Sequence, residues 1–289
     1  SLHDALPICR LWLRRLCVLN REIFMDIGSK LWYTIRTCNS EKTKSGRGFS
    51  VKIDVMGVPF DNVTMEEALD RALTLMHEPG AAYVVTPNSE IVYEAMHDEA
   101  LRQMLSQADL VLPDGAGVVL AAKILKTPVK QKVAGIEFGT NLMERLAGTG
   151  KTFYFLGSKP GVAETAAKKL HEKFPDLQIC GTHDGYFQED GPVIEEINAL
   201  EPDVLLVCLG APKQEWFMAN HREELHVGLM AGLGGSLDGF AGNVKRAPRW
   251  MIRCNLEWFY RLIKEPWRLG RMMRLPKFLF CVIGKRIRG

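Results

Sequence analysis

Short apolar segments alternate with stretches of helical periodicity from residue 51 onwards, and this alternation is the main structural signal in the chain. Seven segments have the length and composition of β-strands, at residues 53–58, 82–86, 109–112, 152–156, 177–180, 204–209 and 227–231. Most of them are apolar throughout, which is typical of strands buried on both faces of a parallel sheet. The pattern therefore predicts an α/β fold with a mostly parallel sheet and helices on both faces.

The helices between these strands carry recognisable start signals. Thr64-Met65-Glu66-Glu67 is typical of a capping box and begins a helix that extends to about His77, and Pro160-Gly161 begins another that extends to Phe174. In parallel sheets, ligands bind beyond the carboxyl ends of the strands. The loops that follow the strands are therefore where we expect the chemistry.

The chain divides into three parts by composition. Residues 1–50 lack sustained periodicity and end in a polar, glycine-containing linker, so we interpret them as a leader that is either disordered or not native. Residues 51–242 form the predicted α/β domain. In residues 243–289, apolar positions recur at helical spacing on one side and Lys and Arg on another, which indicates a basic amphipathic helical appendage. We expect Pro248, Pro266 and Pro276 to divide it into short helices.

Charge is distributed unevenly between these parts. The appendage contains thirteen Lys or Arg against two Glu, a net charge of +11, and the whole chain carries +3, which leaves −8 for residues 1–242. A basic tail on an acidic body indicates an anionic partner, with membrane headgroups, nucleic acid and a phosphorylated substrate as candidates. Because no segment reaches the roughly 18 to 20 uninterrupted apolar residues that span a bilayer, we do not expect the chain to cross a membrane by itself.

The cysteines and histidines are not spaced as metal ligands. The seven cysteines include no CxxC pair, and their odd number excludes a complete disulfide framework, so we expect a reducing compartment. No DxD motif follows a predicted strand. We therefore expect no metal ion and no cofactor.

Asp114 lies in the loop after the third predicted strand, in the sequence Pro113-Asp114-Gly115-Ala116-Gly117. An ionised carboxylate there could deprotonate a sugar hydroxyl as it attacks an anomeric carbon, with the two glycines allowing a ligand to approach the backbone. The simpler interpretation is a turn with Asp114 as a helix cap, and spacing alone favours it. Thr86 and Asn88 follow the second strand, and they could equally cap a helix or bind sugar hydroxyls.

Three further loops combine glycine with the strand–loop–helix arrangement that receives phosphates and nucleotides. They are Gly157-Ser158-Lys159-Pro160-Gly161, Gly210-Ala211-Pro212-Lys213-Gln214-Glu215 and Gly232-Leu233-Gly234-Gly235-Ser236-Leu237-Asp238. Each alone is a weak signal, because tight turns between strands and helices use glycine for steric reasons. Three of them along one sheet edge favour a nucleotide site.

The same loops resemble the WecG/TagA/CpsF glycosyltransferase family. The resemblance rests on Thr86-Pro87-Asn88, Pro113-Asp114-Gly115 with Gly117, the motif 210–215, Gly232-Leu233-Gly234, Arg246-Ala247-Pro248 and the segment 258–271, and it covers about residues 51–277. It implies an inverting, metal-independent glycosyltransferase with a Rossmann-like sheet of the GT-E type. In the TagA branch, which the chain resembles most, N-acetylmannosamine passes from UDP to undecaprenyl-diphosphate-N-acetylglucosamine during synthesis of the wall teichoic acid linkage unit.

The resemblance also implies roles for individual residues. Asp114 would be the general base, and Thr86, Asn88 and Gln214 would surround the reacting sugars. The appendage arginines that match those expected to bind the acceptor diphosphate are Arg261, Arg268 and Arg271. The glycine loops place Gly157, Gly210, Gly232 and Gly234 at the nucleotide, and matching to the family adds Tyr186 and Asp238.

The partners expected are a UDP-sugar donor, a polyprenyl-diphosphate-linked sugar acceptor and an anionic membrane surface. A basic amphipathic helix pair can lie among lipid headgroups while its arginines bind a diphosphate, which predicts a cytoplasmic protein bound peripherally at the inner face of the plasma membrane. A homo-oligomer is compatible with the pattern, which does not require one.

Two alternatives remain at this point. The same fold could transfer another UDP-sugar, N-acetylmannosaminuronate or a hexose, to a polyprenyl-diphosphate sugar. A non-enzymatic nucleotide- or nucleic-acid-binding protein would also explain a tail rich in arginine and aromatic residues. Against it, the body carries a net charge of −8, and glycine loops suit a small phosphorylated ligand better than a polymer, so we expect no nucleic-acid partner.

Overall fold

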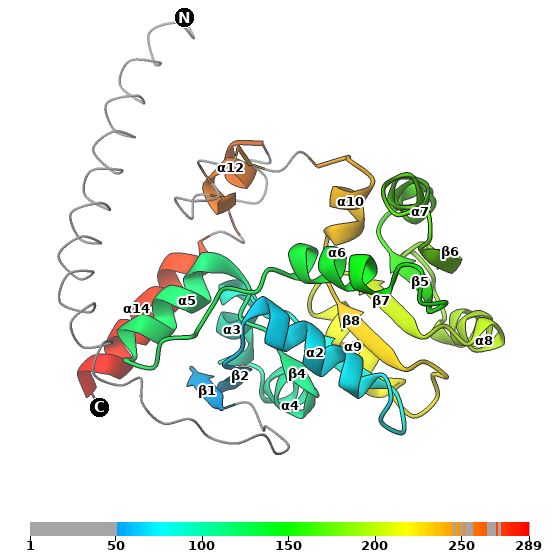
Figure 1. The fold of residues 1–289 in the computed structure, drawn as a ribbon. Coiled ribbons are helices and arrows are strands. Elements are labelled where there is room, and N and C mark those ends of the chain that lie inside the picture. The colour runs from blue at the N-terminus through cyan, green and yellow to red at the C-terminus, as the bar shows by residue number, and fades with distance from the viewer. Residues whose placement is uncertain are drawn as a thin grey trace, which may run out of the picture. The chain divides into compact units, whose positions relative to one another are not determined.

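The computed structural model describes residues 51–244, 247–248, 251, 257–264, 270 and 273–288 (Figure 1). Six strands form a parallel sheet in the order β4-β3-β8-β7-β5-β6. They are β3 (Ala82–Val85), β4 (Leu110–Val111), β5 (Thr152–Gly157), β6 (Gln178–His183), β7 (Val204–Cys208) and β8 (Leu229–Gly232). The predicted α/β fold with a parallel sheet is confirmed. The leader, residues 1–50, lies outside the described residues.

The first predicted strand, residues 53–58, is wrong, because this segment is a hairpin. β1 (Lys52–Val55) and β2 (Val58–Asp61) pair antiparallel in a separate two-stranded sheet. Between them, Met56 and Gly57 adopt φ angles of 58° and 94°, as the two central residues of a type I′ turn do. Met56 at the first turn position replaces the usual Asn or Asp, so the apolar run conceals the turn.

Helices cover both faces of the parallel sheet, as predicted. Along β7, Leu205 and Val207 belong to the core that includes buried residues of α3, α4, α8 and α9, whereas Val204 and Leu206 belong to the core that includes those of α2, α6 and α7. This alternation is the two-residue period of a strand that is buried on both faces. The helices are α2 (Met65–Leu75), α3 (Ser89–Ala95), α4 (Glu99–Gln107), α5 (Gly115–Ile124), α6 (Gly135–Leu146), α7 (Val162–Lys173), α8 (Asp190–Leu200), α9 (Lys213–Asn220) and α10 (Ser236–Phe240).

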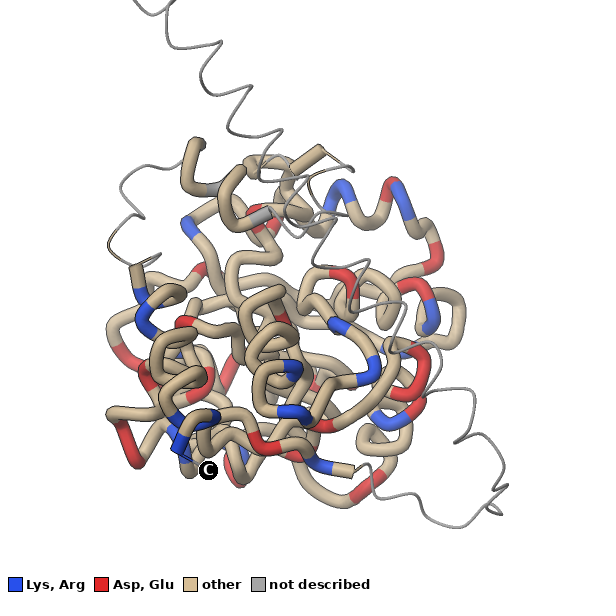
Figure 2. The backbone as a smooth tube through the Cα atoms, turned by 90° about the vertical axis from the view of Figure 1, so that its left-hand side faces the viewer, with Lys and Arg blue, Asp and Glu red and all other residues tan. Residues whose placement is uncertain are grey.

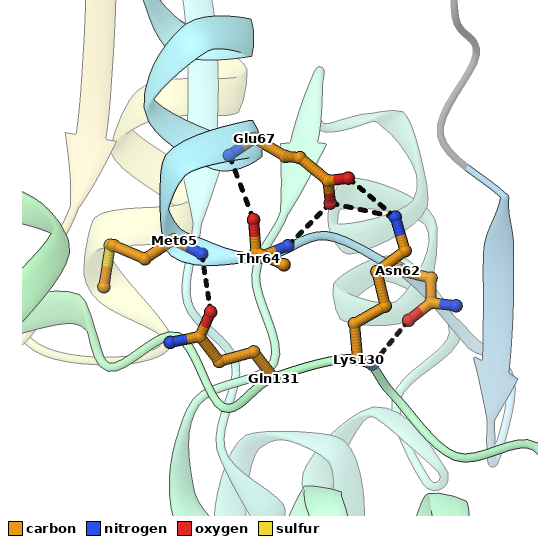
Figure 3. Close-up of polar contacts among 6 residues, drawn as sticks. All are labelled: Asn62, Thr64, Met65, Glu67, Lys130 and Gln131. Atoms are coloured by element: carbon orange, nitrogen blue, oxygen red, sulfur yellow. Dashed lines mark hydrogen bonds and ion pairs between the residues drawn. The ribbon is translucent and has the colours of Figure 1, made fainter. Parts of the chain in front are cut away.

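Hydrogen bonds connect the start of α2 with Lys130 and Gln131, in the loop that precedes α6. The predicted capping box is present: the Thr64 hydroxyl accepts a hydrogen bond from the Glu67 N–H, and the Glu67 carboxylate accepts one from the Thr64 N–H. Lys130 donates to both Glu67 carboxylate oxygens at 2.8 and 2.9 Å (Figure 3). The Gln131 side chain accepts from the Met65 N–H at 2.9 Å. These contacts fix the approach to Gly135, where α6 begins.

Two helices of the C-terminal region are described, α12 (Glu257–Lys264) and α14 (Arg274–Arg288). Phe278 and Val282 of α14 are fully buried, and the helix packs against α3 and α5. Helical structure with this apolar face agrees with the amphipathic pattern of the sequence. In the part of the chain that the structure describes, no helix has the length and hydrophobicity needed to cross a membrane.

Two ion pairs connect α14 with the rest of the domain. Arg274 lies 2.9 Å from Glu94 of α3, and Lys285 lies 3.1 Å from Asp54 of β1. Pro276 lies in the first turn of α14, where its missing N–H leaves no helical hydrogen bond unmade. Pro276 therefore lies near the start of a helix, which agrees with the expectation that it separates helical segments, whereas Pro266 lies outside the described residues.

Candidate active site

The loops after β3, β7 and β8 meet at the carboxyl edge of the sheet. The Thr86 hydroxyl donates a hydrogen bond to the Gly232 carbonyl oxygen at 2.8 Å, and both groups are buried. The Gly234 N–H donates to the Gln214 side-chain oxygen at 2.9 Å. Thr86, Gln214 and two of the predicted glycines are therefore brought together from three separate loops.

Asp114 occupies the N-cap position of α5, but among the described residues its carboxylate makes no capping hydrogen bond to that helix. Instead, Oδ2 accepts a hydrogen bond of 3.3 Å from the N–H of Gly135, the first residue of α6. The capping interpretation of Asp114 is therefore wrong. A Cβ atom on Gly135 would lie 3.1 Å from the Thr86 hydroxyl oxygen, so Asp114 and Thr86 approach the same residue.

Asn88 does cap its helix. Its Oδ1 atom accepts hydrogen bonds from the N–H groups of Glu90 and Ile91 at 2.8 and 3.2 Å. A Cβ atom on Gly115 would lie 3.7 Å from the Asn88 Cβ, so Asn88 lies against the Asp114 loop. Because capping uses only the amide oxygen, the two N–H donors of the amide are the part that could bind a sugar hydroxyl.

Close packing explains several of the glycines. Gly157 has a φ of 131°, and a Cβ atom there would lie 2.3 Å from the Cys208 carbonyl oxygen. A Cβ atom on Gly117 would lie 2.7 Å from Ser89 and 2.8 Å from Leu275 of α14. Gly117 thus permits helix packing, and the expectation that it opens the backbone to a ligand is wrong.

The remaining predicted glycines divide into two kinds. A Cβ atom on Gly232 would lie 2.7 Å from the Met218 methyl group, so this position is required for packing. Gly210 and Gly234 have φ angles of 76° and 58°, and a Cβ atom on either would meet no described atom within 4 Å. These two glycines serve the turn conformation, and the space beside them is open to a ligand.

The loops after β5, β6 and β8 form the predicted nucleotide side. The Ser158 hydroxyl donates to the Asp238 carboxylate at 3.1 Å, and the Gly185 N–H donates to the Ser158 carbonyl at 2.9 Å. Tyr186, next in the chain, is 63% exposed. Asp238 and Tyr186 thus lie at one loop junction, and their contact with a nucleotide stays a prediction.

Lys213 lies beside the predicted nucleotide loops, and sequence reasoning did not single it out. Its ammonium group donates to the Gly185 carbonyl at 3.1 Å and lies 4.3 Å from the centre of the Phe187 ring. It is therefore a cation beside the predicted nucleotide loops. Its position directly before Gln214 in a glycine-containing βα loop was the available signal.

Glu215 is the most deeply buried carboxyl group at this edge of the sheet. It is 0% exposed, and its Oε1 accepts a hydrogen bond of 2.9 Å from Gln214 Nε2. Its Oε2 has no hydrogen-bond partner among the described residues. Burial raises the pKa of Glu215, and the nearby Glu94 carboxylate acts in the same direction.

One of the three predicted appendage arginines lies in a described helix. The backbone of Arg261 lies in α12, whereas Arg268 and Arg271 lie outside the described residues. Within the described residues, no group of three or more His, Cys, Asp or Glu side chains could hold a metal ion. The roles of the arginines and the independence from metal and cofactor stay predictions.

Comparison with known proteins shows that the chain is a glycosyltransferase. A model of the glycosyl transferase WecG/TagA/CpsF family matches residues 53–289, and the chain therefore belongs to this family. This confirms the resemblance that the loop motifs carry.

Named relatives make the comparison more specific. The chain is 38% identical to a protein of Bacillus spizizenii over 210 residues, which are 73% of this chain and 82% of the relative. It is 39% identical to one of Bacillus subtilis over 202 residues, 70% of this chain and 79% of the relative. A Staphylococcus aureus protein is 33% identical over 243 residues, 83% of this chain and 95% of the relative. All three are named N-acetylglucosaminyldiphosphoundecaprenol N-acetyl-beta-D-mannosaminyltransferase.

Proposed function

We propose that this protein transfers N-acetylmannosamine from UDP-N-acetylmannosamine to undecaprenyl-diphosphate-N-acetylglucosamine, in the synthesis of the wall teichoic acid linkage unit. The observation that carries the proposal is the similarity, over most of the chain, to transferases that bear the name of this reaction. The convergence of Asp114, Thr86 and Gln214 on neighbouring loops supports it.

In this proposal Asp114 acts as the general base. Its carboxylate takes the proton from the acceptor hydroxyl while that oxygen attacks the anomeric carbon of the donor sugar. The bond between the anomeric carbon and the UDP oxygen breaks on the opposite side, so the configuration inverts and UDP leaves. The hydrogen bond from Gly135 holds the carboxylate in place for this step.

The leaving UDP carries negative charge that the nucleotide loops must stabilise. The backbone N–H group in the open glycine turn at Gly210 can donate to a phosphate oxygen, whereas the Gly234 N–H already donates to Gln214. Lys213, which follows this turn in the chain, adds a positive charge. Stabilisation of this kind needs no divalent cation, which is why we propose a metal-independent reaction.

We further propose peripheral binding to an anionic membrane, at the inner face of the plasma membrane. Phe280, Ile283 and Ile287 are exposed on α14 at spacings of three and four residues, which places them along one side of the helix, and the exposed Met273 directly precedes it. Lys and Arg residues lie in the last turn of the same helix, near the end of the chain (Figure 2). Apolar side chains beside cations suit insertion among anionic headgroups.

The enzymatic proposal is tested by UDP release and lipid product analysis with UDP-N-acetylmannosamine, a short-chain prenyl-diphosphate-N-acetylglucosamine and EDTA. Wild-type protein should form the disaccharide lipid, and Asp114→Asn should lower kcat by about 100- to 10,000-fold. If the wild type formed no product from UDP-N-acetylmannosamine but did form product from a uronate or hexose donor, that donor would replace N-acetylmannosamine in the proposal. Equal rates for both proteins would remove Asp114 from the role of base.

The membrane proposal has its own test. The protein should sediment with phosphatidylglycerol vesicles and remain in the supernatant with phosphatidylcholine vesicles, and salt should weaken the binding. Failure to bind anionic vesicles would exclude the peripheral membrane role and leave the transfer reaction untouched.

A further inference from the structure

Glu215 has no role in the reaction as proposed so far, yet it is buried next to Gln214. Burying a carboxyl group costs free energy unless hydrogen bonds compensate, and one of its two oxygens has no partner among the described residues. A leucine or methionine would fill the same space without that cost. The hydrogen bond that Glu215 does make therefore indicates what the carboxyl group is for.

That hydrogen bond settles the direction of the Gln214 amide. Gln214 Oε1 accepts from the Gly234 N–H, and Gln214 Nε2 donates to Glu215 Oε1, both at 2.9 Å. A flipped amide would point N–H toward N–H at Gly234 and oxygen toward oxygen at Glu215. Each neighbour therefore excludes the flipped orientation, and the amide is held at both ends.

The same contacts connect Gln214 with the reacting residues. A Cβ atom on Gly232 would lie 3.1 Å from Gln214 Nε2, and the Gly232 carbonyl accepts the hydrogen bond from Thr86. Gln214 thus packs against the residue that joins the ends of β3 and β8. A shift of the Gln214 amide would therefore disturb Gly232, whose carbonyl oxygen accepts the hydrogen bond from Thr86.

We propose that Glu215 is a positioning residue, which holds the Gln214 amide in the orientation that the transfer reaction uses by accepting the hydrogen bond from Nε2. This inference rests on the proposed place of Gln214 beside the reacting sugars. It requires only an acceptor atom at Oε1, so a neutral side chain of the same shape can take the place of the acid.

Two variants separate this role from packing. Glu215→Leu keeps an apolar filling and removes the acceptor, and kcat should fall on the order of tenfold to a hundredfold, while the melting temperature stays equal or rises because the unpartnered oxygen is gone. Glu215→Gln restores an acceptor oxygen and should return kcat close to the wild-type value. A merely structural role would instead move activity and stability together.

A double-mutant cycle tests whether the effect passes through Gln214. In a Gln214→Leu background, Glu215→Leu should cause little further loss of kcat, because the amide that it positions is absent. The control is Glu196→Leu, since Glu196 of α8 accepts a 2.6 Å hydrogen bond from the hydroxyl of the buried Tyr154 in β5, away from Gln214. This control should lower the melting temperature without lowering kcat.

An assay-independent measurement keeps this inference separate from the proposed function. The side-chain amide signal of Gln214 in ¹⁵N spectra, assigned by its loss in Gln214→Leu, should exchange slowly with solvent in the wild type and in Glu215→Gln, and faster in Glu215→Leu. The inference would be overturned if Glu215→Leu kept full kcat, or if Glu215→Gln lost as much kcat as Glu215→Leu. It would also be overturned if Glu215→Leu caused the same loss in the Gln214→Leu background, or if amide exchange were the same in all three proteins. If wild-type protein transfers no sugar at all, the proposed function fails, and the exchange measurement still decides the role of Glu215.

Discussion

The hydroxyl group of Thr86 donates a hydrogen bond to the carbonyl oxygen of Gly232 at 2.8 Å, between residues 146 positions apart in the chain. Val85 and Gly232 are register partners on β3 and β8, so the bond closes the sheet at the point where both strands end. It also places Thr86 beside Gly135, which donates to Asp114. The proposed general base and the centre of the sheet edge are thus held by one set of contacts.

Thr86→Val should destabilise the protein by about 1–3 kcal/mol, because the buried Gly232 carbonyl loses its partner while the shape of the side chain is kept. Thr86→Ser, which retains the hydroxyl, should recover most of this loss. Urea unfolding measures both, with Thr140→Val as the control, since the Thr140 hydroxyl donates a hydrogen bond within its own helix, to the Ile136 carbonyl oxygen. Equal stability of the Val and Ser variants would contradict this account.

Gly157→Ala should destabilise the protein by about 2–6 kcal/mol, from overpacking and backbone strain together. The φ of 131° disfavours any side chain, and the Cys208 carbonyl oxygen occupies the space that Cβ needs. Gly191→Ala in α8 is the matched control: no described atom lies within 4 Å of its Cβ position, and it should be neutral or stabilising by up to about 1 kcal/mol. Thermal unfolding compares the two, and a mild effect at Gly157 would mean that β5 and β7 can separate there.

Stability should depend on pH through Glu67. The hydrogen bond from Lys130, followed by that from the Thr64 N–H, lowers the pKa of the Glu67 carboxyl below its ordinary value of 4.5. A carboxyl with a lowered folded-state pKa contributes stability above its unfolded-state pKa, and this contribution is lost as the pH falls through the folded-state pKa. The difference in unfolding free energy between wild type and Glu67→Gln should therefore shrink as the pH falls from neutral to below the ordinary pKa of 4.5.

Lys130→Met provides the control for this pH effect, since it removes the largest cause of the lowered pKa and leaves the capping hydrogen bonds of Thr64 intact. The difference in unfolding free energy between Lys130→Met and Glu67→Gln should depend less on pH than the difference between wild type and Glu67→Gln. A pH dependence as steep as that of the wild type would show that Lys130 is not the main cause.

Substitution of Phe278 in α14 should lower stability, whereas substitution of Phe280 in the same helix should lower membrane binding. Phe278 is fully buried against the domain, so Phe278→Ala should cost about 3–5 kcal/mol in unfolding free energy. Phe280 is 74% exposed, so Phe280→Ala should leave stability nearly unchanged and weaken sedimentation with phosphatidylglycerol vesicles. If Phe280→Ala bound vesicles as well as wild type, the exposed side of α14 would not be the membrane-facing surface.

Much of the fold was readable because its signals are local. Apolar runs located the strands of the parallel sheet, and the capping box at Thr64 placed the start of α2, because both depend on residues within one turn or one strand of each other. The glycine loops likewise pointed to the carboxyl edge of the sheet, since strand direction alone puts them there. The hairpin at Met56 and Gly57 was missed because the usual turn residues are absent.

The site itself depended on contacts between distant parts of the chain. Local spacing favoured Asp114 as a cap for α5, whereas in the fold its carboxylate accepts a hydrogen bond from Gly135 at the start of α6. Gly117 suggested an opening for a ligand until Leu275, from the far end of the chain, filled the space. Periodicity reports which way a side chain faces, whereas the partner it meets there depends on how whole elements pack. The sequence alone therefore identified the family and the sheet edge, and packing decided which atoms at that edge hold one another.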